Sequence, residues 1–400
     1  MHEPKDEASL ADLISQAKES GSPLAIQGGN SRLGLGHDVE GAPLTTRALS
    51  GITLYEPGAL TLVARAGTPL SEIESAVAGE GQVLPFEAPR WARMLGNEAA
   101  GESTIGGVVA TNASGPRRIL SGACRDSLIG VRFVDGSGRV LKNGGRVMKN
   151  VTGYDLVKLM CGSHGTLGVL TEVSFKLLPA PEKTVTLTLH GLYDATAVRA
   201  MSAALGSPFN VSGATHAPQG ARGDAATCLR LEGLSASVDY RAAELARTLS
   251  KFGAAEVDED PTSVEATWRS ARDVDVMSAS QDSSEGNSEG SDVWRVSTRP
   301  SDGPAVAARF GNARSFYDWG GGLVWLAVEP GTNVRAQLSG AASGHATLFR
   351  ASAQTRRALG AFEPESAPLA QLSEGLRREF DPAGVLNRGR MAITTAAAAA

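Results

Sequence analysis

The first 180 residues alternate between short apolar strand patterns and amphipathic helix patterns. Residues 7–20 place apolar side chains at helical spacing and stop at Gly21, which predicts a helix. After the strand pattern of residues 61–66, Thr68 and Pro69 predict the N-cap and the first turn of a second helix. The same patterns predict strands at 23–27 and 169–177, a short helix within 103–115, a helix at about 154–161, and a β-hairpin over 127–145 that turns at Asp135-Gly136.

Pro179 and Pro181 end this part of the chain, and we place a domain boundary at residue 181. A second α/β domain is predicted over 182–361, with strands at 184–192, 228–234, 293–297 and 322–329 and helices at 193–205 and 235–252. Residues 278–292 are rich in Ser, Glu and Gly, which predicts a flexible surface insertion. Residues 362–391 predict a C-terminal helix and tail, and 392–400 a frayed end.

Composition and charge exclude several classes of protein. The chain has 38 Lys and Arg against 43 Asp and Glu, a net charge of −5, which argues against nucleic-acid binding because phosphate recognition needs a basic surface. Its three cysteines are too few for a disulfide framework or for an iron–sulfur cluster held by this chain alone. The sequence shows no secretory leader and no apolar run of ~18 residues, so we expect a cytoplasmic protein with no membrane span of its own.

Glycine is the outlier, at 47 of 400 residues, and it gathers in three loops, Gly28–Gly36, Ser103–Gly115 and Gly162–Gly168. Such loops can turn consecutive backbone N–H groups toward an anion, since glycine tolerates positive φ and carries no side chain. Three of them within one domain indicate a long ligand with a pyrophosphate in its middle. The sequence has no G-x-x-x-x-G-K-[ST] string, and the partial fingerprint at 34–39 ends in Val39 with no helix behind it. We therefore exclude a P-loop and an NAD-binding Rossmann domain.

The strings IQGGNSRLGLG, STIGGVVATNASGPRR and KNVTGYDLVKLMCGSHGTLGVLTEVSFKLLP resemble, in this order, flavoproteins of the vanillyl-alcohol-oxidase/p-cresol-methylhydroxylase family. DWGGGLVW, GHATLFR and FDPAGVLNRGRM add a resemblance to the smaller, FAD-binding subunits of bacterial glycolate oxidases. The resemblance implies an α+β fold, in which a two-subdomain PCMH-type FAD-binding domain precedes a smaller α/β cap domain and residues 362–391 return to the flavin. It also implies noncovalent FAD, because Asn30 stands in the loop where relatives with covalent flavin carry a histidine.

Carried over residue by residue, the resemblance implies that the glycine loops and the returning tail hold FAD. The implied cofactor-binding residues are Gly28, Gly29, Asn30, Ser31, Thr104, Gly106, Gly107, Thr111, Gly115, Gly165, Thr166, Gly168, Val169 and Asn387. Relatives that oxidise D-2-hydroxy acids directly carry a His/Glu metal cluster in the second domain. Here His190, His216 and His345 stand far apart, so no metal site is expected.

Two interpretations of His345 stay open. It is either an ordinary hydrogen-bonded imidazole at a strand end or a catalytic group facing the flavin, with Arg350 as the catalytic clamp for a substrate carboxylate. Trp319 is expected either in the core or over the flavin. His164, inside a flavin loop, is expected as a neutral ring that faces solvent, with contact to the cofactor as the alternative.

The resemblance implies a flavoprotein subunit of a glycolate oxidase complex, which oxidises glycolate or a similar 2-hydroxy acid to the 2-oxo acid and passes electrons through its flavin to a partner. The implied partners are a larger FAD- and metal-bearing subunit and an iron–sulfur subunit, through which any membrane association is made. Two alternatives stay open. One is a non-catalytic subunit that holds FAD as a relay or scaffold, and the other is a stand-alone FAD oxidoreductase of the same fold that acts on another alcohol.

Overall fold

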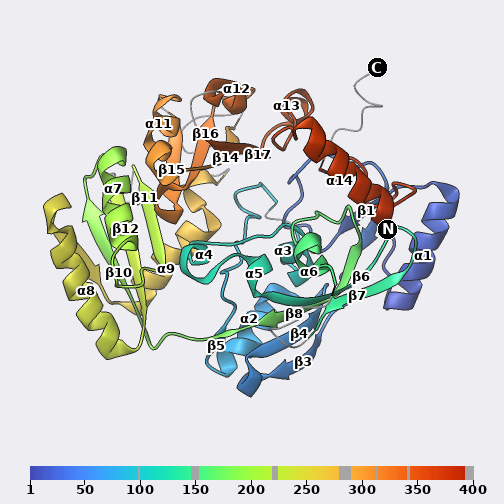
Figure 1. Ribbon diagram of the computed structural model, residues 1–400, viewed down its shortest axis with the longest axis horizontal. Coiled ribbons are helices and arrows are strands. Elements are labelled where there is room, and N and C mark those ends of the chain that lie inside the picture. Colours follow the sequence, from blue (N-terminus) through green and yellow to red (C-terminus); the bar gives the residue numbers. More distant parts are fainter. Residues whose placement is uncertain are drawn as a thin grey trace.

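The computed structural model describes residues 1–97, 100–145, 153–218, 224–278, 290–311, 313–339 and 343–391. Most of the predicted insertion at 278–292 and the whole predicted tail at 392–400 lie outside these residues. Helices and strands mix along the chain (Figure 1), and none of the described helices is long and apolar enough to cross a membrane.

An antiparallel five-stranded sheet, in the order β3-β4-β8-β6-β7, forms the centre of the first half of the chain. Two small pairs accompany it, the parallel pair β1-β2 and the antiparallel pair β5-β9. Leu62, Phe133 and Phe175, from three neighbouring strands, are fully buried and hold these strands in one layer. The elements of this half are α1 Glu7–Ser20, β1 Leu24–Gln27, β2 Ala42–Thr45, β3 Ile52–Glu56, β4 Thr61–Arg65, α2 Leu70–Gly79, β5 Gln82–Val83, α3 Ile105–Ala110, α4 Arg118–Ser121, α5 Cys124–Ser127, β6 Leu128–Val134, β7 Val140–Gly144, α6 Leu156–Met160, β8 Val169–Lys176 and β9 Leu178–Pro179.

Every helix and strand predicted for this half is present, but two details of the prediction are wrong. Thr68 does not cap α2, because its hydroxyl donates to the Arg65 carbonyl at 2.7 Å. The side chain of Glu102 caps the helix instead and accepts from the Ser71 N–H at 2.8 Å. The hairpin turn is also longer than Asp135-Gly136, since β6 and β7 first pair at 134 and 140 and the positive φ falls on residue 138.

The second half forms an antiparallel eight-stranded sheet, in the order β13-β10-β12-β11-β15-β16-β14-β17. Helices α7 and α8 lie on the side away from the five-stranded sheet (Figure 1). The predicted strands and helices of this half are present, whereas β11, β13, β15, α9 and α11 to α13 were not predicted. The elements are β10 Lys183–His190, α7 Asp194–Leu205, β11 Gly213–Ala217, β12 Ala226–Gly233, α8 Ser235–Leu249, β13 Ala255–Asp258, α9 Pro261–Asp273, β14 Asp292–Thr298, α11 Gly303–Ala308, β15 Arg314–Asp318, β16 Leu323–Val328, α12 Val334–Leu338, β17 Gly344–Arg350, α13 Ala353–Leu359 and α14 Ala367–Phe380.

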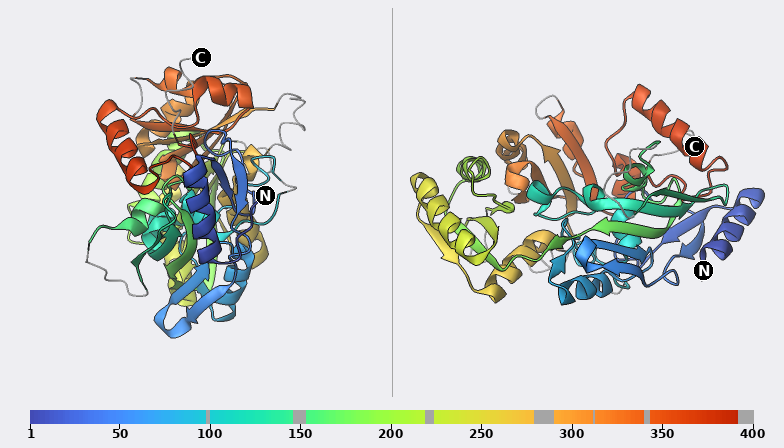
Figure 2. Two further views of the ribbon diagram at one scale, coloured as in Figure 1. Left: turned by 90° about the vertical axis from the view of Figure 1, so that its right-hand side faces the viewer. Right: turned by 60° about the horizontal axis from the view of Figure 1, so that its bottom comes forward.

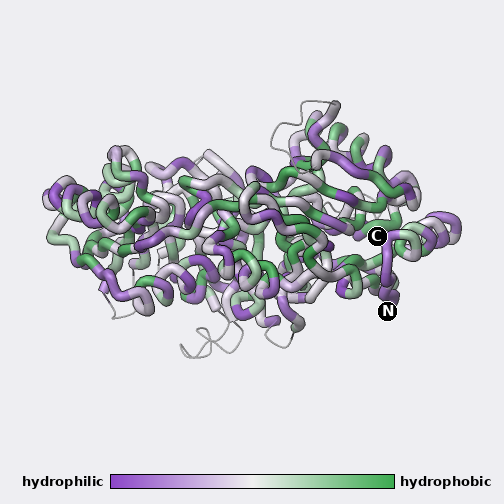
Figure 3. Tube along the Cα trace, turned by 90° about the horizontal axis from the view of Figure 1, so that it is seen from below, coloured by the Kyte–Doolittle hydropathy of each residue, from purple (hydrophilic) through white to green (hydrophobic). Residues whose placement is uncertain are grey.

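One hydrophobic core runs across the junction of the two sheets. The chain leaves the first sheet at Pro179 and enters the second at Lys183, but apolar side chains from both halves pack in a single cluster. Trp91 lies edge-on to the rings of Trp325 and Phe349, with ring centroids 6.5 and 4.8 Å apart. The domain limits stay a prediction, and the shared core means that the two sheets pack as one body. Along the peripheral helices hydrophilic and hydrophobic residues alternate (Figure 3), as expected of helices that cover such a core.

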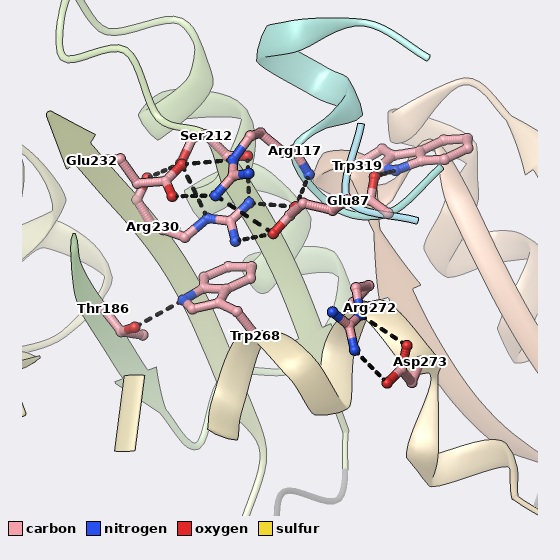
Figure 4. Close-up of polar contacts among 11 residues, drawn as sticks. Glu87, Arg117, Thr186, Ser212, Arg230, Glu232, Trp268, Arg272, Asp273 and Trp319 are labelled. Atoms are coloured by element: carbon pink, nitrogen blue, oxygen red, sulfur yellow. Dashed lines mark hydrogen bonds and ion pairs between the residues drawn. The ribbon is translucent and has the colours of Figure 1, made fainter. Parts of the chain in front are cut away.

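A buried network of charges also joins the two halves (Figure 4). Arg230 on β12, only 2% exposed, donates to both carboxylate oxygens of Glu87 at 2.7 and 2.8 Å. Arg117 pairs with Glu232 at 2.6 Å and lies 3.7 Å from Glu87. Burial raises the pKa of Glu87, but the charges of Arg230 and Arg117 outweigh burial and hold it at about 2. The network therefore fixes the second sheet against the first while every charge in it keeps a partner.

The C-terminal segment crosses the outside of the molecule and then returns to the first sheet. Of the residues of α14 only Phe380 is buried, and the helix lies at the periphery in the views of Figures 1 and 2. Leu369, Leu372 and Leu376 share one face of α14 and are 56, 67 and 41% exposed. Beyond the helix, a parallel bridge to β1 at residues 24 and 386 brings the last described residues beside the first glycine loop.

Candidate functional site

A cavity of about 850 Å³, its opening to solvent included, lies where the three glycine loops meet the returning tail. Twelve of the fourteen predicted cofactor-binding residues line it: Gly28, Gly29, Asn30, Ser31, Thr104, Gly106, Gly107, Thr111, Gly165, Gly168, Val169 and Asn387. The other two lie outside its wall. Thr166 donates its hydroxyl to the Ser163 carbonyl at 2.7 Å, and Gly115 accepts from the Trp319 indole N–H at 3.2 Å.

Two glycines let the first loop press against residues 102–104. A Cβ on Gly28 would lie 2.3 Å from Thr104 Oγ1, and one on Gly29 would lie 1.5 Å from the Glu102 carbonyl oxygen. Asn30 then takes a left-handed φ of 62°, which Asn tolerates better than most residues. Its buried side-chain oxygen has no hydrogen-bond partner among the described residues. Close backbone approach thus shapes the loop, and the loop offers an unsatisfied amide to a ligand.

Arg32 is the main residue of this cavity that sequence analysis missed. Its guanidinium donates to Ser103 Oγ and to the Pro89 carbonyl, both at 2.7 Å, while its buried Nε has no partner in the described part of the chain. Burial lowers the pKa of Arg32 to about 10. A buried cation that forms no ion pair with a described carboxylate favours an anionic ligand. Its position next to the glycines in GGNSR was the signal in the sequence.

The second glycine loop forms the floor of the cavity at the start of α3. Thr104 caps the helix, and its Oγ1 accepts from the Gly107 N–H at 3.4 Å. Gly106 packs tightly, because a Cβ there would lie 2.7 Å from the Ala66 carbonyl oxygen. A Cβ on Gly107 would contact only Thr104 Oγ1, at 3.4 Å. Gly106 therefore serves packing, whereas Gly107 keeps the cavity open.

Asn387 ties the returning tail to the first and third loops. Its side chain accepts from the Ile26 N–H at 2.7 Å and donates to the His164 carbonyl at 2.8 Å. Arg390, which also lines the cavity, donates to the Leu35 carbonyl at 3.2 Å. These bonds close the cavity with residues from the far end of the described chain.

A second cavity, of about 680 Å³ with its opening included, adjoins the first and shares Leu35, Thr111 and His164 with it. His164 was expected to face solvent, but it lines both cavities and lies edge-on to Phe362, with ring centroids 5.3 Å apart. Burial and then the charge of Arg390 lower the pKa of His164 to about 4, so its ring is neutral near pH 7. The remaining wall of the second cavity consists of Gly36, Trp91, Asn112, Ser114, Arg118, Arg295, Thr347, Leu348, Phe349 and Phe362.

The two predicted catalytic residues line neither cavity. Arg350 uses its guanidinium on the backbone, donating to the Met94 and Met277 carbonyls, both at 2.8 Å. His345 is exposed at the start of β17. Five residue steps along a strand span about 16 Å, so the structure does not bring the pair together. In the described ranges no group of three or more His, Cys, Asp or Glu is placed to hold a metal ion.

The residues of the first cavity fit a dinucleotide such as FAD. Glycine backbone lines the cavity at three places, and Arg32 supplies a positive charge. The unpartnered atoms of Asn30 and Arg32 can form hydrogen bonds with a polar ligand.

Comparisons with known proteins point in the same direction. The FAD binding domain family matches residues 1–144. Glycolate oxidase subunit GlcE of Escherichia coli (strain K12) is 37% identical over 385 residues, which cover 96% of each chain. Glycolate oxidase subunit GlcD of Bacillus subtilis (strain 168) is 45% identical over 96 residues, 24% of this chain and 20% of its own. The solved structure of p-cresol methylhydroxylase with substrate bound matches 98% of this chain and 88% of its own, with a TM-score of 0.70 at 14% identity. That likeness confirms the predicted PCMH-type α+β fold.

Proposed function

Since the chain belongs to the family of the Escherichia coli glycolate oxidase subunit GlcE, we propose that it is the FAD-binding subunit of a glycolate oxidase complex. The observation that carries the proposal is the cavity walled by three glycine loops and the tail at Asn387. FAD is the cofactor of this chain, and when bound it accepts the two electrons released as a 2-hydroxy acid becomes a 2-oxo acid.

The chain's own residues bind and shield this cofactor. The glycine backbone of residues 28–29 offers N–H groups, and Arg32 offers positive charge, to the anionic part of FAD. The hydrogen bonds of Asn387 to Ile26 and His164 close the cavity at the tail. With Asn30 in the first loop, we propose that FAD is held without a covalent bond.

Acid precipitation of the purified chain tests both parts of the proposal. We expect yellow FAD in the supernatant, in about equimolar amount to protein. Flavin that stays in the pellet contradicts noncovalent binding. A chain that purifies without flavin and takes up none when FAD is added contradicts the proposed function. Anaerobic mixing with glycolate then separates the alternatives. We expect slow bleaching of the isolated chain's flavin and fast bleaching after a larger subunit is added, whereas fast bleaching of the isolated chain identifies a stand-alone enzyme.

We also propose that the chain assembles with a larger, FAD- and metal-bearing subunit and with an iron–sulfur subunit, in the cytoplasm or at the membrane through that complex. Support comes from α14, because helices of ~12–15 residues are marginal in water without packing, and this one leaves three leucines exposed. Leu372→Lys should reduce co-purification with the larger subunit and leave the chain folded. Tyr193→Lys, at an 86% exposed position outside α14, is the matched control.

A further inference from the structure

The second cavity carries two guanidinium groups with no carboxylate partner. Arg118, on α4, and Arg295, on β14, both line it, and neither guanidinium forms a hydrogen bond or ion pair with another described residue. Two other shielded arginines, Arg230 and Arg335, have partners for their guanidinium groups. Arg230 pairs with a carboxylate, and Arg335 donates to four backbone carbonyls. The donors of this pair are therefore available to a ligand.

Aromatic rings fix the two guanidiniums in place without neutralising them. The Arg118 and Arg295 guanidinium carbons lie 4.5 and 5.1 Å from the ring of Trp319, and Arg295 lies 5.9 Å from that of Trp325. The Trp319 indole N–H donates to the Gly115 carbonyl at 3.2 Å, which holds that ring across the junction of the two halves. Stacking on a ring face orients a guanidinium while its N–H groups stay free to donate in the plane.

Neither arginine of this region forms an ion pair with a described residue, although an acid acts on each. Burial and then the nearby Arg118 charge lower the pKa of Arg295 to about 10. Burial also lowers the pKa of Arg118, and the charge of Asp126 opposes that shift. Asp318, the acid that acts on Arg295, accepts from the Trp319 backbone N–H at 2.7 Å, and burial and then the charge of Glu87 raise its pKa to about 7. It is therefore only partly ionised near pH 7. Two cations that line one cavity, neither of them in an ion pair with a described residue, favour the entry of an anion.

We propose that Arg118 and Arg295 bind the carboxylate of a small 2-hydroxy acid in the second cavity. The planar fork of a guanidinium matches a carboxylate in two parallel hydrogen bonds. The acid's remaining atoms then lie toward Thr111 and His164, the polar residues that this cavity shares with the first. The inference rests on the proposed function, since FAD in the first cavity is the group that would oxidise an acid bound beside the shared residues. It assigns the carboxylate clamp to these two residues in place of Arg350.

Equilibrium titration of the FAD-loaded full chain tests the assignment. Acetate is the probe because it has the carboxylate but no hydroxyl to oxidise, and acetamide is its neutral isostere. Binding is read by calorimetry and by the visible spectrum of the flavin. We expect acetate to bind and acetamide to bind at least tenfold more weakly. Arg118→Met and Arg295→Met should each weaken acetate at least tenfold with unchanged FAD content, and Arg295→Lys should recover part of the loss. Arg125→Met, at a neighbouring exposed arginine, is the matched control and should bind acetate normally.

The outcomes separate this inference from the proposed function. A wild-type chain that holds FAD but binds no acetate, or binds acetamide equally well, overturns the carboxylate site. Variants at Arg118 and Arg295 that keep wild-type affinity overturn it as well. If Arg295→Met does not fold, Arg118→Met on the cavity rim decides. Absence of FAD from the wild-type chain contradicts the proposed function alone, because calorimetry with the FAD-free chain still reports on the two arginines.

Discussion

Glu87→Gln removes one charge from the network that joins the two sheets, and the expected loss of stability follows from the pKa of that carboxyl. A carboxyl held at about 2 instead of its ordinary 4.5 stabilises the folded protein by about 3 kcal/mol at neutral pH, at about 1.4 kcal/mol per pH unit. Removing one partner of a buried ion pair costs a similar ~3–5 kcal/mol. Because the folded-state pKa is depressed, this stabilisation is complete above pH 4.5 and is lost as the pH falls toward 2.

Urea unfolding followed by tryptophan fluorescence measures the effect. We expect Glu87→Gln to unfold with a free energy about 3 kcal/mol below wild type at pH 7, and the difference to narrow to about 1.5 kcal/mol at pH 3. Glu74→Gln is the control, since Glu74 and Arg90 pair at 2.5 Å with both side chains about one-third exposed, and such pairs contribute at most ~1 kcal/mol. Equal losses in the two variants, or a difference that does not change with pH, would refute the reasoning.

Three further predictions concern the first cavity. Asn387→Ala removes the bonds that tie the tail to the loops and should weaken FAD binding at least tenfold, measured by fluorescence of released FAD, while Asn333→Ala, which removes only the cap of α12, should not. Gly107→Ala should keep FAD because a Cβ there has room, whereas Gly107→Asp should lose it through charge repulsion; equal flavin contents in the two variants contradict a role at the cofactor. His164 has a folded-state pKa of about 4, below its ordinary 6.5, so the stability contributed by its neutral ring is present above pH 6.5 and lost as the pH falls toward 4. With His164→Asn, the free energy of unfolding measured between pH 6.5 and 4 should change less with pH than in the wild type.

Sequence patterns predicted elements whose determinants lie within a few neighbouring residues. The helix at 7–20 and the hairpin at 127–145 belong to this class, because periodicity alone specifies which face is buried. The cap of α2 does not belong to this class, since Glu102 accepts from the Ser71 N–H across a separation of 31 residues. Local propensity pointed to Thr68, and a tertiary contact decided otherwise.

The cofactor loops could be located from the sequence, but the second cavity could not. Glycine clusters mark the places where backbone approaches a ligand, and most of the predicted cofactor-binding residues do line the first cavity. Arg118 and Arg295 come from a short helix in one half and a strand in the other, and only the docking of the two sheets brings both beside Trp319. The sequence interpretation that made Arg350 a carboxylate clamp rested on its place in the string GHATLFR, but its guanidinium donates to backbone carbonyls instead.

The hydrogen bond between Ile26 and Asn387 spans 361 positions of the chain, and this separation governs when the protein can take up flavin. A nascent chain of 144 residues, the length of the matched FAD binding domain, has the first two glycine loops but lacks the third and the closing tail. Contacts of such long range form late in folding because the loop between them must first be ordered. We therefore expect tight flavin binding to follow the folding of the second sheet, which lies between Ile26 and Asn387 in the chain. We expect a replacement in the core beside that sheet, such as one at Trp268 on α9, to lower the yield of yellow protein without touching the cofactor.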